Sequence, residues 1–443
     1  MRLAQALRLG TDPCLAFTGA GGKTTALFEL ARQLPPPVLL TATTHLATGQ
    51  LSLADRHSVL RDPEEAERAL NELQPEVNLL TGPAGESERT SGLDQATLER
   101  VHALAEAWGM PLIIEADGSR LHPLKAPADH EPAIPPWVDE VVVVAGLSGL
   151  GKPLSEEWVH RPERFTTLTG LKQGETISVE ALARLLAHPE GGLKNIPPRA
   201  RRVALLNQAD TTELQAVAGR LAILLQLAYS AILVASLHTG GEGAVRAVYE
   251  RVAGVILAAG GSSRLGRPKQ LLDWHGVPFV RQVARTALEA GLSPVVVVTG
   301  ADADQVAAPL QDLPVSVVNN PDWAAGQGSS VATGVRALPP ETGAAIFLLV
   351  DQPQVQPELI NSLVAIHRRT LAAVVAPQAD GQRANPVLFD RVTFDDLLAL
   401  KGDVGGRSIF SRYQVEWLPW HDSRLLLDVD TLEDYRRLLD SGA

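Results

Sequence analysis

The chain is poor in cysteine and in positive charge, and each shortage excludes a class of protein or site. Cys14 is the single cysteine among 443 residues, so an internal disulfide and a zinc site built from several cysteines are both excluded. The 39 lysines and arginines are outnumbered by 51 aspartates and glutamates, which gives a formal net charge of −12. Because nucleic acids bind to basic surfaces, we expect no nucleic-acid partner. A nucleotide needs only a local basic pocket and remains compatible with this charge.

Long apolar runs are also lacking. The most apolar stretch, residues 221–237, is interrupted by Gln226, Tyr229 and two serines. We interpret it as a helix running into a buried strand rather than as a membrane span. The N-terminus shows no basic start followed by an apolar core and a cleavage site, so no signal peptide is predicted. We therefore expect a cytoplasmic protein with no membrane partner.

Strand-like apolar runs alternate with helix-length amphipathic segments along the whole chain, a pattern typical of parallel α/β sheets. The length exceeds that of one typical core. A glycine-rich loop suited to phosphate occurs twice, near residue 20 and near residue 260, and each loop is expected to open its own sheet. The sequence over 241–251 is interpreted as helical and leads into the second opening strand. We therefore predict two α/β domains, residues 1–250 and 251–443.

The second glycine-rich loop follows an apolar strand that ends near residue 258. Glycines carry no Cβ, so their backbone N–H groups can approach a triphosphate closely. Arg264 and Lys269 lie beyond the loop and are predicted to neutralise phosphate charge during a displacement reaction. No Gly-Lys-Ser/Thr occurs here, so this is not a Walker A loop. The predicted nucleotide-binding residues are Leu257, Ala258, Ala259, Gly260, Gly261 and Ser262.

Carboxylates follow apolar runs at two further places in this domain. Asp351 comes directly after the apolar run 346–350, and Asp430 lies shortly before the last predicted helix. Two carboxylates on different strands can hold Mg²⁺ between the phosphates of a nucleotide, and we predict that role for this pair. A lone Asp after a strand is often a helix cap, but the nearby loop favours a functional role. Ser329 and Ser330 are predicted either to lie near the nucleotide or to be plain helix caps.

Together these motifs resemble the MobA-like nucleotidyltransferases, most closely their molybdenum cofactor cytidylyltransferase branch, over residues 254–439. The resemblance implies a Rossmann-like sheet that transfers CMP from CTP to the terminal phosphate of molybdopterin and releases pyrophosphate. It implies Arg264, Lys269 and Asp351 as catalytic residues. Ala259 stands where related guanylyltransferases usually carry Gly, which favours CTP. The motifs are Leu-Ala-Ala-Gly at 257–260, Ser-x-Arg-x-Gly-x-x-Lys at 262–269, Gly-x-Gly-Ser-Ser at 326–330, Asp-Gln-Pro at 351–353, Asn-Pro at 385–386, Gly-Asp-x-Gly-Gly-Arg at 402–407 and Asp-Val-Asp-Thr at 428–431.

Three positions depart from the family pattern, namely Gln327, Val331 and Ala384. They bear on the identity of the acceptor more than on the class of reaction. A cytidylyltransferase acting on a sugar or polyol phosphate is therefore kept as an alternative.

The first glycine-rich loop lies between a short apolar strand and a helical run, the context that a P-loop requires. Lys23 is predicted to contact the β- and γ-phosphates and Thr24 to contact Mg²⁺, although Phe17 replaces the usual first glycine. An apolar strand over 112–115 ends in acids, and we predict Asp117, with Glu115 as the next choice, to serve the metal. The predicted nucleotide-binding residues of this loop are Gly19, Gly21, Gly22, Lys23, Thr24 and Thr25.

Residues 207–210, Asn-Gln-Ala-Asp, follow another buried strand and are similar to the guanine-reading motif of GTPases, with Gln in place of Lys. Asp210 would accept both N–H donors of guanine, which adenine lacks, and Asn207 would assist. The alternative is a plain turn, so the nucleotide is GTP or ATP. His45, His122 and His130 are either metal or substrate ligands or ordinary surface residues.

Residues 5–240 resemble the YqeC family, described as accessory proteins for selenium-dependent molybdenum hydroxylases. The resemblance rests on residues 19–24, 43–45, 115–120 and 125–132. The two resemblances together predict a bifunctional maturation protein for a molybdenum hydroxylase cofactor, with an N-terminal P-loop NTPase and a C-terminal cytidylyltransferase. Its partners would be molybdopterin or molybdenum cofactor and an apo molybdenum hydroxylase. The alternative is a carrier that delivers finished cofactor to the hydroxylase, with NTP hydrolysis as its switch.

Overall fold

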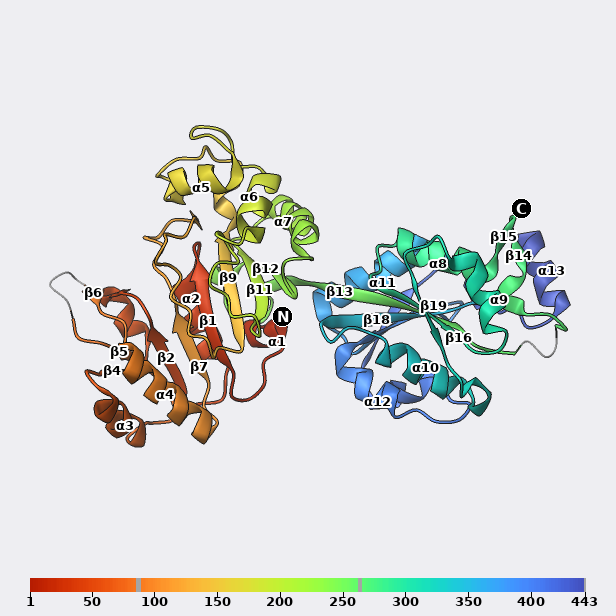
Figure 1. Ribbon diagram of the computed structural model, residues 1–443, viewed down its shortest axis with the longest axis horizontal. Coiled ribbons are helices and arrows are strands. Elements are labelled where there is room, and N and C mark those ends of the chain that lie inside the picture. Colours follow the sequence, from red (N-terminus) through yellow and green to blue (C-terminus); the bar gives the residue numbers. More distant parts are fainter. Residues whose placement is uncertain (85–88, 262–264, 442–443) are drawn as a thin grey trace. The chain divides into compact units, whose positions relative to one another are not determined.

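In the computed structural model, the chain divides into two compact units, Met1–Tyr249 and Glu250–Ala443 (Figure 1). The structure describes residues 1–84, 89–261 and 265–441. Both units have a largely parallel sheet, so the predicted mixed α/β class is confirmed. Over these described ranges, no helix combines the length and apolar composition needed to cross a bilayer.

The sheet of the N-terminal unit is parallel throughout the pairs described here, and its strands read as buried apolar runs. Strand β1 lies near the middle, so the loop that follows it opens at the centre of the sheet's carboxyl edge. The strand order is β12 (Ala231–Ala235), β11 (Arg201–Asn207), β9 (Glu140–Gly146), β1 (Cys14–Gly19), β7 (Leu112–Glu115), β2 (Val38–Ala42), β5 (Val77–Thr81) and β4 (Arg56–Val59).

Helices cover both faces of this sheet. Buried side chains from α3, α4, α6 and α7 pack in one cluster with Cys14 and Ala16 of β1. Helix α2 contacts β1, β2 and β7 and follows the first glycine-rich loop directly. The helices of this unit are α1 (Leu3–Leu7), α2 (Lys23–Ala31), α3 (Pro63–Asn71), α4 (Gln95–Trp108), α5 (Pro162–Thr169), α6 (Val179–Ala187) and α7 (Thr212–Leu225).

Two short strand pairs lie outside the main sheet and carry residues of the candidate site. Strand β3 (Leu46–Ala47) pairs antiparallel with β6 (Arg89–Thr90), and β8 (Leu124–Lys125) pairs parallel with β10 (Val159–His160).

The sheet of the C-terminal unit is mixed. Strand β13 pairs parallel with β16 and β18, whereas β21 runs antiparallel to both β18 and β19. The strand order is β17 (Ser316–Asn319), β16 (Val295–Thr299), β13 (Val245–Ala258), β18 (Thr342–Leu349), β21 (Val387–Asp390), β19 (Val374–Ala379) and β22 (Val415–Pro419).

Two core clusters lie on opposite faces of this second sheet. Helices α8 and α11 pack with Ile256 and Ala258 on one face, and helices α10 and α12 pack with Val255 and Val298 on the other. The helices are α8 (Phe279–Glu289), α9 (Ala303–Ala307), α10 (Gln327–Arg336), α11 (Pro357–Thr370), α12 (Phe394–Leu398) and α13 (Leu432–Ser441).

The helix predicted over 241–251 is wrong, because this segment enters strand β13 at Val245. Gly240, Gly241 and Gly243 all have positive φ, a conformation that does not start a helix. From Val248 to Val252 buried and partly exposed residues alternate, as expected for a strand packed on one side.

Candidate nucleotide sites

The first glycine-rich loop joins β1 to α2, and its geometry requires glycine. Gly19, Gly21 and Gly22 have φ values of 92°, 84° and 116°. A Cβ at Gly21 would lie 2.3 Å from the backbone nitrogen of Gly146, so a larger residue would push the loop away from β9. The loop ends at the N-terminus of α2, where unpaired N–H groups and the helix dipole attract an anion.

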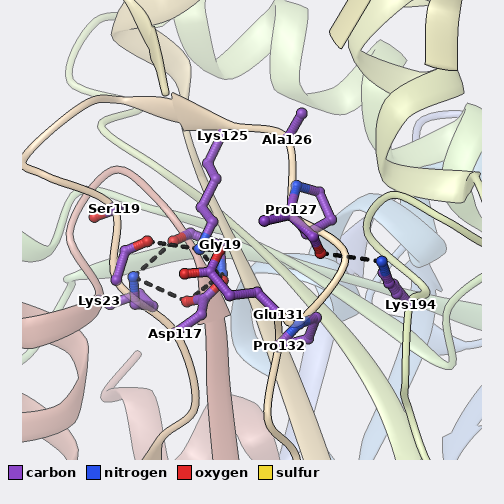
Figure 2. Close-up of polar contacts among 12 residues, drawn as sticks. Gly19, Lys23, Asp117, Ser119, Lys125, Ala126, Pro127, Glu131, Pro132 and Lys194 are labelled. Atoms are coloured by element: carbon purple, nitrogen blue, oxygen red, sulfur yellow. Dashed lines mark hydrogen bonds and ion pairs between the residues drawn. The ribbon is translucent and has the colours of Figure 1, made fainter. Parts of the chain in front are cut away.

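Lys23 is buried in an ion-pair network behind this loop (Figure 2). Its Nζ donates to the carbonyl oxygen of Gly19 at 2.6 Å and lies 3.1 Å from Oδ1 of Asp117. The Gly19 N–H donates to both Asp117 oxygens at 3.1 Å, and Lys125 Nζ donates to Oδ2 at 2.8 Å. The sequence predicts Asp117 as a metal ligand, but both its oxygens already have partners in the loop and on Lys125. In this geometry it is a positioning residue.

Lys125, on β8, connects this network to a second acid. Its Nζ lies 2.8 Å from Oε2 of Glu131, which also accepts from Arg161 Nη1 at 2.8 Å. Burial alone would raise the pKa of Glu131, but the two cations outweigh it and lower the pKa to about 2. The family resemblance alone points to residues 125–132, and in the structure Lys125 and Glu131 brace the loop through Asp117.

Glu115, the second choice for the metal, has a different environment from Asp117. Its side chain is 9% exposed, and Oε2 has no hydrogen-bond partner among the described residues. Burial raises the pKa of this carboxyl, against the opposing charge of Lys23 at 3.9 Å. Glu115 and Thr24 both line a cleft of about 370 Å³ beside the loop. An unpartnered carboxylate oxygen near a threonine hydroxyl fits the oxygen ligands that Mg²⁺ prefers.

The predicted histidines separate into two groups. His45 and His130 line the same cleft. His122 does not, since its ring nitrogens face the carbonyl oxygens of Ser119 and Glu156 at 3.1 and 2.7 Å. Gln50, which the sequence did not single out, donates to the Thr24 hydroxyl at 2.9 Å.

Asn207 and Asp210 lie at the carboxyl end of β11. Asn207 Nδ2 donates to the Gly21 carbonyl at 2.8 Å, and its Oδ1 accepts from the N–H of Leu237 at 3.1 Å. Asn207 therefore ties the phosphate loop to the segment after β12. Asp210 Oδ1 accepts from the Ser236 hydroxyl at 2.6 Å, while its side chain remains 43% exposed. The carboxylate is thus oriented but accessible, as a base-reading residue must be.

The second glycine-rich loop borders a cleft of about 640 Å³ at the carboxyl end of β13. Leu257, Ala259, Gly260 and Gly261 line this cleft. Ala258 does not: it is fully buried in the core shared with α8 and α11. This follows from the alternation of side chains along a strand. The predicted Ser262 and Arg264 lie outside the described residues.

Lys269 lies between the two predicted metal carboxylates. Its Nζ is 2.5 Å from Oδ2 of Asp351 and 3.1 Å from Oδ1 of Asp430. Burial lowers the pKa of Lys269, but the two carboxylates overcome this effect and raise it above its ordinary value. Asp351 Oδ1 is buried without a hydrogen-bond partner among the described residues. That oxygen, together with Asp430, suits a divalent cation once the lysine turns toward phosphate.

The serine at the start of α10 that lines the cleft is Ser330, not Ser329. The Ser329 hydroxyl donates to the carbonyl oxygens of Asp322 and Gly326 and accepts from Asn320 Nδ2 at 2.8 Å. Ser330 also accepts from Asn320, at 3.0 Å. Asn320, which the sequence argument missed, therefore fixes the helix start beside the cleft.

A second cleft of about 520 Å³ adjoins the first. The two share Leu257, Gln327, Leu349 and Asp403 as lining residues. Basic and amide side chains project into the second cleft from Arg383, Asn385 and Arg407.

Within the described part of the chain, no group of three or more His, Cys, Asp or Glu residues is arranged around a common metal position. A metal here would therefore depend on two carboxylates and on oxygens of the nucleotide.

Comparison with known proteins assigns a family to each part. The family model for the YqeC protein matches residues 15–163, and that for the MobA-like NTP transferase domain matches residues 254–417. Protein YqeC of Escherichia coli (strain K12) is 36% identical over 210 residues, which cover 45% of this chain and 77% of that protein.

The C-terminal part has relatives with different names. Nicotine blue oxidoreductase of Paenarthrobacter nicotinovorans is 34% identical over 198 residues, covering 42% of this chain and 96% of that protein. The "Probable molybdenum cofactor guanylyltransferase" of Mycobacterium avium (strain 104) is 33% identical over 202 residues, covering 44% and 98%. The crystal structure of Rv0371c from Mycobacterium tuberculosis H37Rv is 30% identical, with a TM-score of 0.39 and coverage of 43% and 98%. As its motifs predicted, the chain belongs to the YqeC family in its N-terminal part and to the MobA-like NTP transferase family in its C-terminal part.

Proposed function

We propose that the C-terminal unit transfers CMP from CTP to the terminal phosphate of molybdopterin. The observation that carries this proposal is the pair of adjoining clefts. The first is bordered by the glycine-rich loop, Lys269 and Asp351, which suits a triphosphate. The second presents Arg383 and Arg407, which suit the anionic phosphate of an acceptor.

The chemistry needs positioning and charge neutralisation more than proton transfer. An oxygen of the acceptor phosphate attacks the α-phosphorus, the bond to the β-phosphate breaks, and pyrophosphate leaves. Because a phosphate monoester is already anionic at neutral pH, no general base is required. Lys269 would neutralise the nucleotide phosphates, and Arg264 is proposed for the leaving pyrophosphate. Mg²⁺ held by Asp351 and Asp430 would polarise the phosphate oxygens.

Ala259 supports the choice of CTP. Its side chain is buried beside the loop at the edge of the first cleft, where a methyl group takes space that a glycine would leave to a larger base. GTP is the competing nucleotide, because one relative of this part is named as a guanylyltransferase.

The test is pyrophosphate release by the full chain with Mg²⁺ and molybdopterin, using CTP, GTP and ATP in separate reactions. We expect release with CTP only. Release with GTP only would refute the base assignment but keep the reaction class. No release with any nucleotide, from protein shown to be folded, would favour the carrier alternative or a sugar or polyol phosphate as acceptor.

For the N-terminal unit we propose a P-loop site that binds and hydrolyses an NTP in an accessory role for an apo molybdenum hydroxylase. The cradle formed by Gly19, Gly21 and Gly22, with Lys23 and Thr24 at the start of α2, supports phosphate binding. Thr24 and Glu115 would hold Mg²⁺, and Asp210 would select GTP over ATP.

Lys23→Ala tests this second proposal. We expect loss of NTP hydrolysis while CTP-dependent pyrophosphate release continues. If the variant hydrolyses NTP at the rate of the unchanged protein, the P-loop assignment is wrong. Loss of both activities in a folded variant would mean that the two units are functionally coupled.

A further inference from the structure

The cleft beside the first glycine-rich loop is lined by charged side chains of both signs, three arginines against Glu115 and Glu131. Three arginines line it: Arg89 on β6, Arg120 in the loop after β7, and Arg161 after β10. At about 370 Å³ it falls within the size range of small-molecule pockets. Thr24 at one edge places this cleft next to the position expected for the terminal phosphate of the nucleotide.

Two of the three arginines have no ion-pair partner among the described residues. Arg161 forms an ion pair with Glu131, which neutralises it. Over the ranges that the structure describes, the side chains of Arg89 and Arg120 make neither an ion pair nor a hydrogen bond. Guanidinium groups have five N–H donors in a planar arrangement that matches phosphate oxygens. Two guanidiniums that line one cleft without an ion-pair partner in the described residues can therefore receive an anion.

The backbone at Arg120 supports a functional role. Arg120 and the following Leu121 have φ values of 50° and 64°, in the left-handed region that residues other than glycine rarely adopt. Leu121 is 95% exposed, so its own burial does not explain this conformation. Strained backbone of this kind is concentrated at binding and catalytic sites.

Glu115 adds an independent observation. The whole residue is only 7% exposed, and it lines the same cleft. Its Oε2 has no hydrogen-bond partner in the described part of the chain. A buried polar atom without a partner is uncommon and indicates a ligand that completes the site. A cation between Glu115 and Thr24 would also remove the negative charge that would otherwise repel an anion.

We propose that this cleft binds a small phosphate-bearing molecule as a second ligand, held by Arg89 and Arg120 beside the terminal phosphate of the bound NTP. The proposal rests on the NTP site proposed above for the same unit. With both sites filled, the N-terminal unit would hold its nucleotide and a second, anionic ligand next to each other.

The test uses the full chain loaded with Mg²⁺ and a saturating non-hydrolysable NTP analogue, so that the P-loop is already filled. Binding of radiolabelled inorganic phosphate is measured by equilibrium dialysis, and glycerol 3-phosphate serves as a competitor. The variants are Arg89→Ala, Arg120→Ala and the double variant. Arg199→Ala is the matched control, because Arg199 is exposed and does not line this cleft.

We expect about one phosphate bound per chain, a loss of at least tenfold in affinity for each cleft arginine removed, and no change in the control. Stronger competition by glycerol 3-phosphate than by unlabelled phosphate would identify an organic phosphate as the ligand, and the reverse would identify the free ion. Phosphate that displaces the analogue, or that binds equally well to the double variant, would overturn the proposal. If the analogue fails to bind but phosphate still requires Arg89 and Arg120, the NTP site is wrong and the anion site stands.

Discussion

Replacing Lys125 by Met should destabilise the N-terminal unit and weaken its phosphate loop together. Lys125 is 1% exposed, and its Nζ contacts Asp117 and Glu131 at 2.8 Å each and the Gly118 carbonyl at 2.6 Å. Methionine keeps the length of the side chain but removes the charge, so two buried carboxylates lose a partner. Removing one member of a buried ion pair costs roughly 3–5 kcal/mol.

We expect a value near the lower end, about 3 kcal/mol, because Asp117 keeps its contact with Lys23 and Glu131 keeps its contact with Arg161. That value corresponds to roughly a hundredfold change in the unfolding equilibrium. NTP affinity should fall as well, since Asp117 holds the Gly19 N–H.

Hydrogen exchange of peptides from β1 and β7 measures the opening free energy of this unit within the full chain. Lys172→Met, at an exposed lysine, is the matched control. Adding Glu131→Gln to Lys125→Met should recover part of the loss, because it removes one unpaired charge. A change below about 0.5 kcal/mol in Lys125→Met would refute the view that this network braces the loop.

Three other predictions concern single groups. Asp351→Asn should lower nucleotidyl transfer at least a hundredfold without unfolding the protein, whereas Asp304→Asn, at an exposed aspartate, should not; pyrophosphate release measures both. Asp210→Asn should lower the affinity for GTP at least tenfold relative to ATP, as measured by competition binding, and an unchanged ratio would make residues 207–210 a plain turn. The pKa of Glu131 is lowered in the folded state, so its stabilising contribution is complete above its ordinary pKa of 4.5 and is lost as the pH falls toward 2. In acid unfolding, the free energy of unfolding of Glu131→Gln should therefore depend less on pH in this window than that of the unchanged protein.

The central strands were predictable because strands buried on both faces read as continuous apolar runs. The predicted run over 112–115 coincides with β7, and the stretch 221–237 is the end of α7 followed by β12, as expected. The strands that the sequence did not reveal include β4 (Arg56–Val59), which lies at the sheet edge and carries Arg, His and Ser. An edge strand is only half covered, so its sequence need not be apolar.

The first glycine-rich loop was predictable for a similar reason, since close approach of its backbone to β9 leaves room for glycine alone at Gly19 and Gly21. The roles of the neighbouring acids were not predictable. Glu115 and Asp117 are two positions apart and would share a face if the strand continued. Strand β7 ends at Glu115, however, and Asp117 turns toward Lys23 and Lys125 instead of toward the cleft. Glu115 and Asp117 therefore have different surroundings because β7 ends between them.

Whether a carboxylate is available to a metal depends on the partners that it keeps once a nucleotide binds. In both units carboxylates hold the lysine that we propose to bind phosphate, and an incoming nucleotide would draw that lysine away. Asp117 would then still have the Gly19 N–H and Lys125, so it gains little from a cation. Asp351 would lose Lys269 as the partner of its Oδ2, while its Oδ1 has no hydrogen-bond partner within the described residues, so it would be left with unpaired negative charge. On this argument Asp351 would gain more from a cation than Asp117 would, which is why we propose Glu115 and Thr24 for the metal of the N-terminal unit.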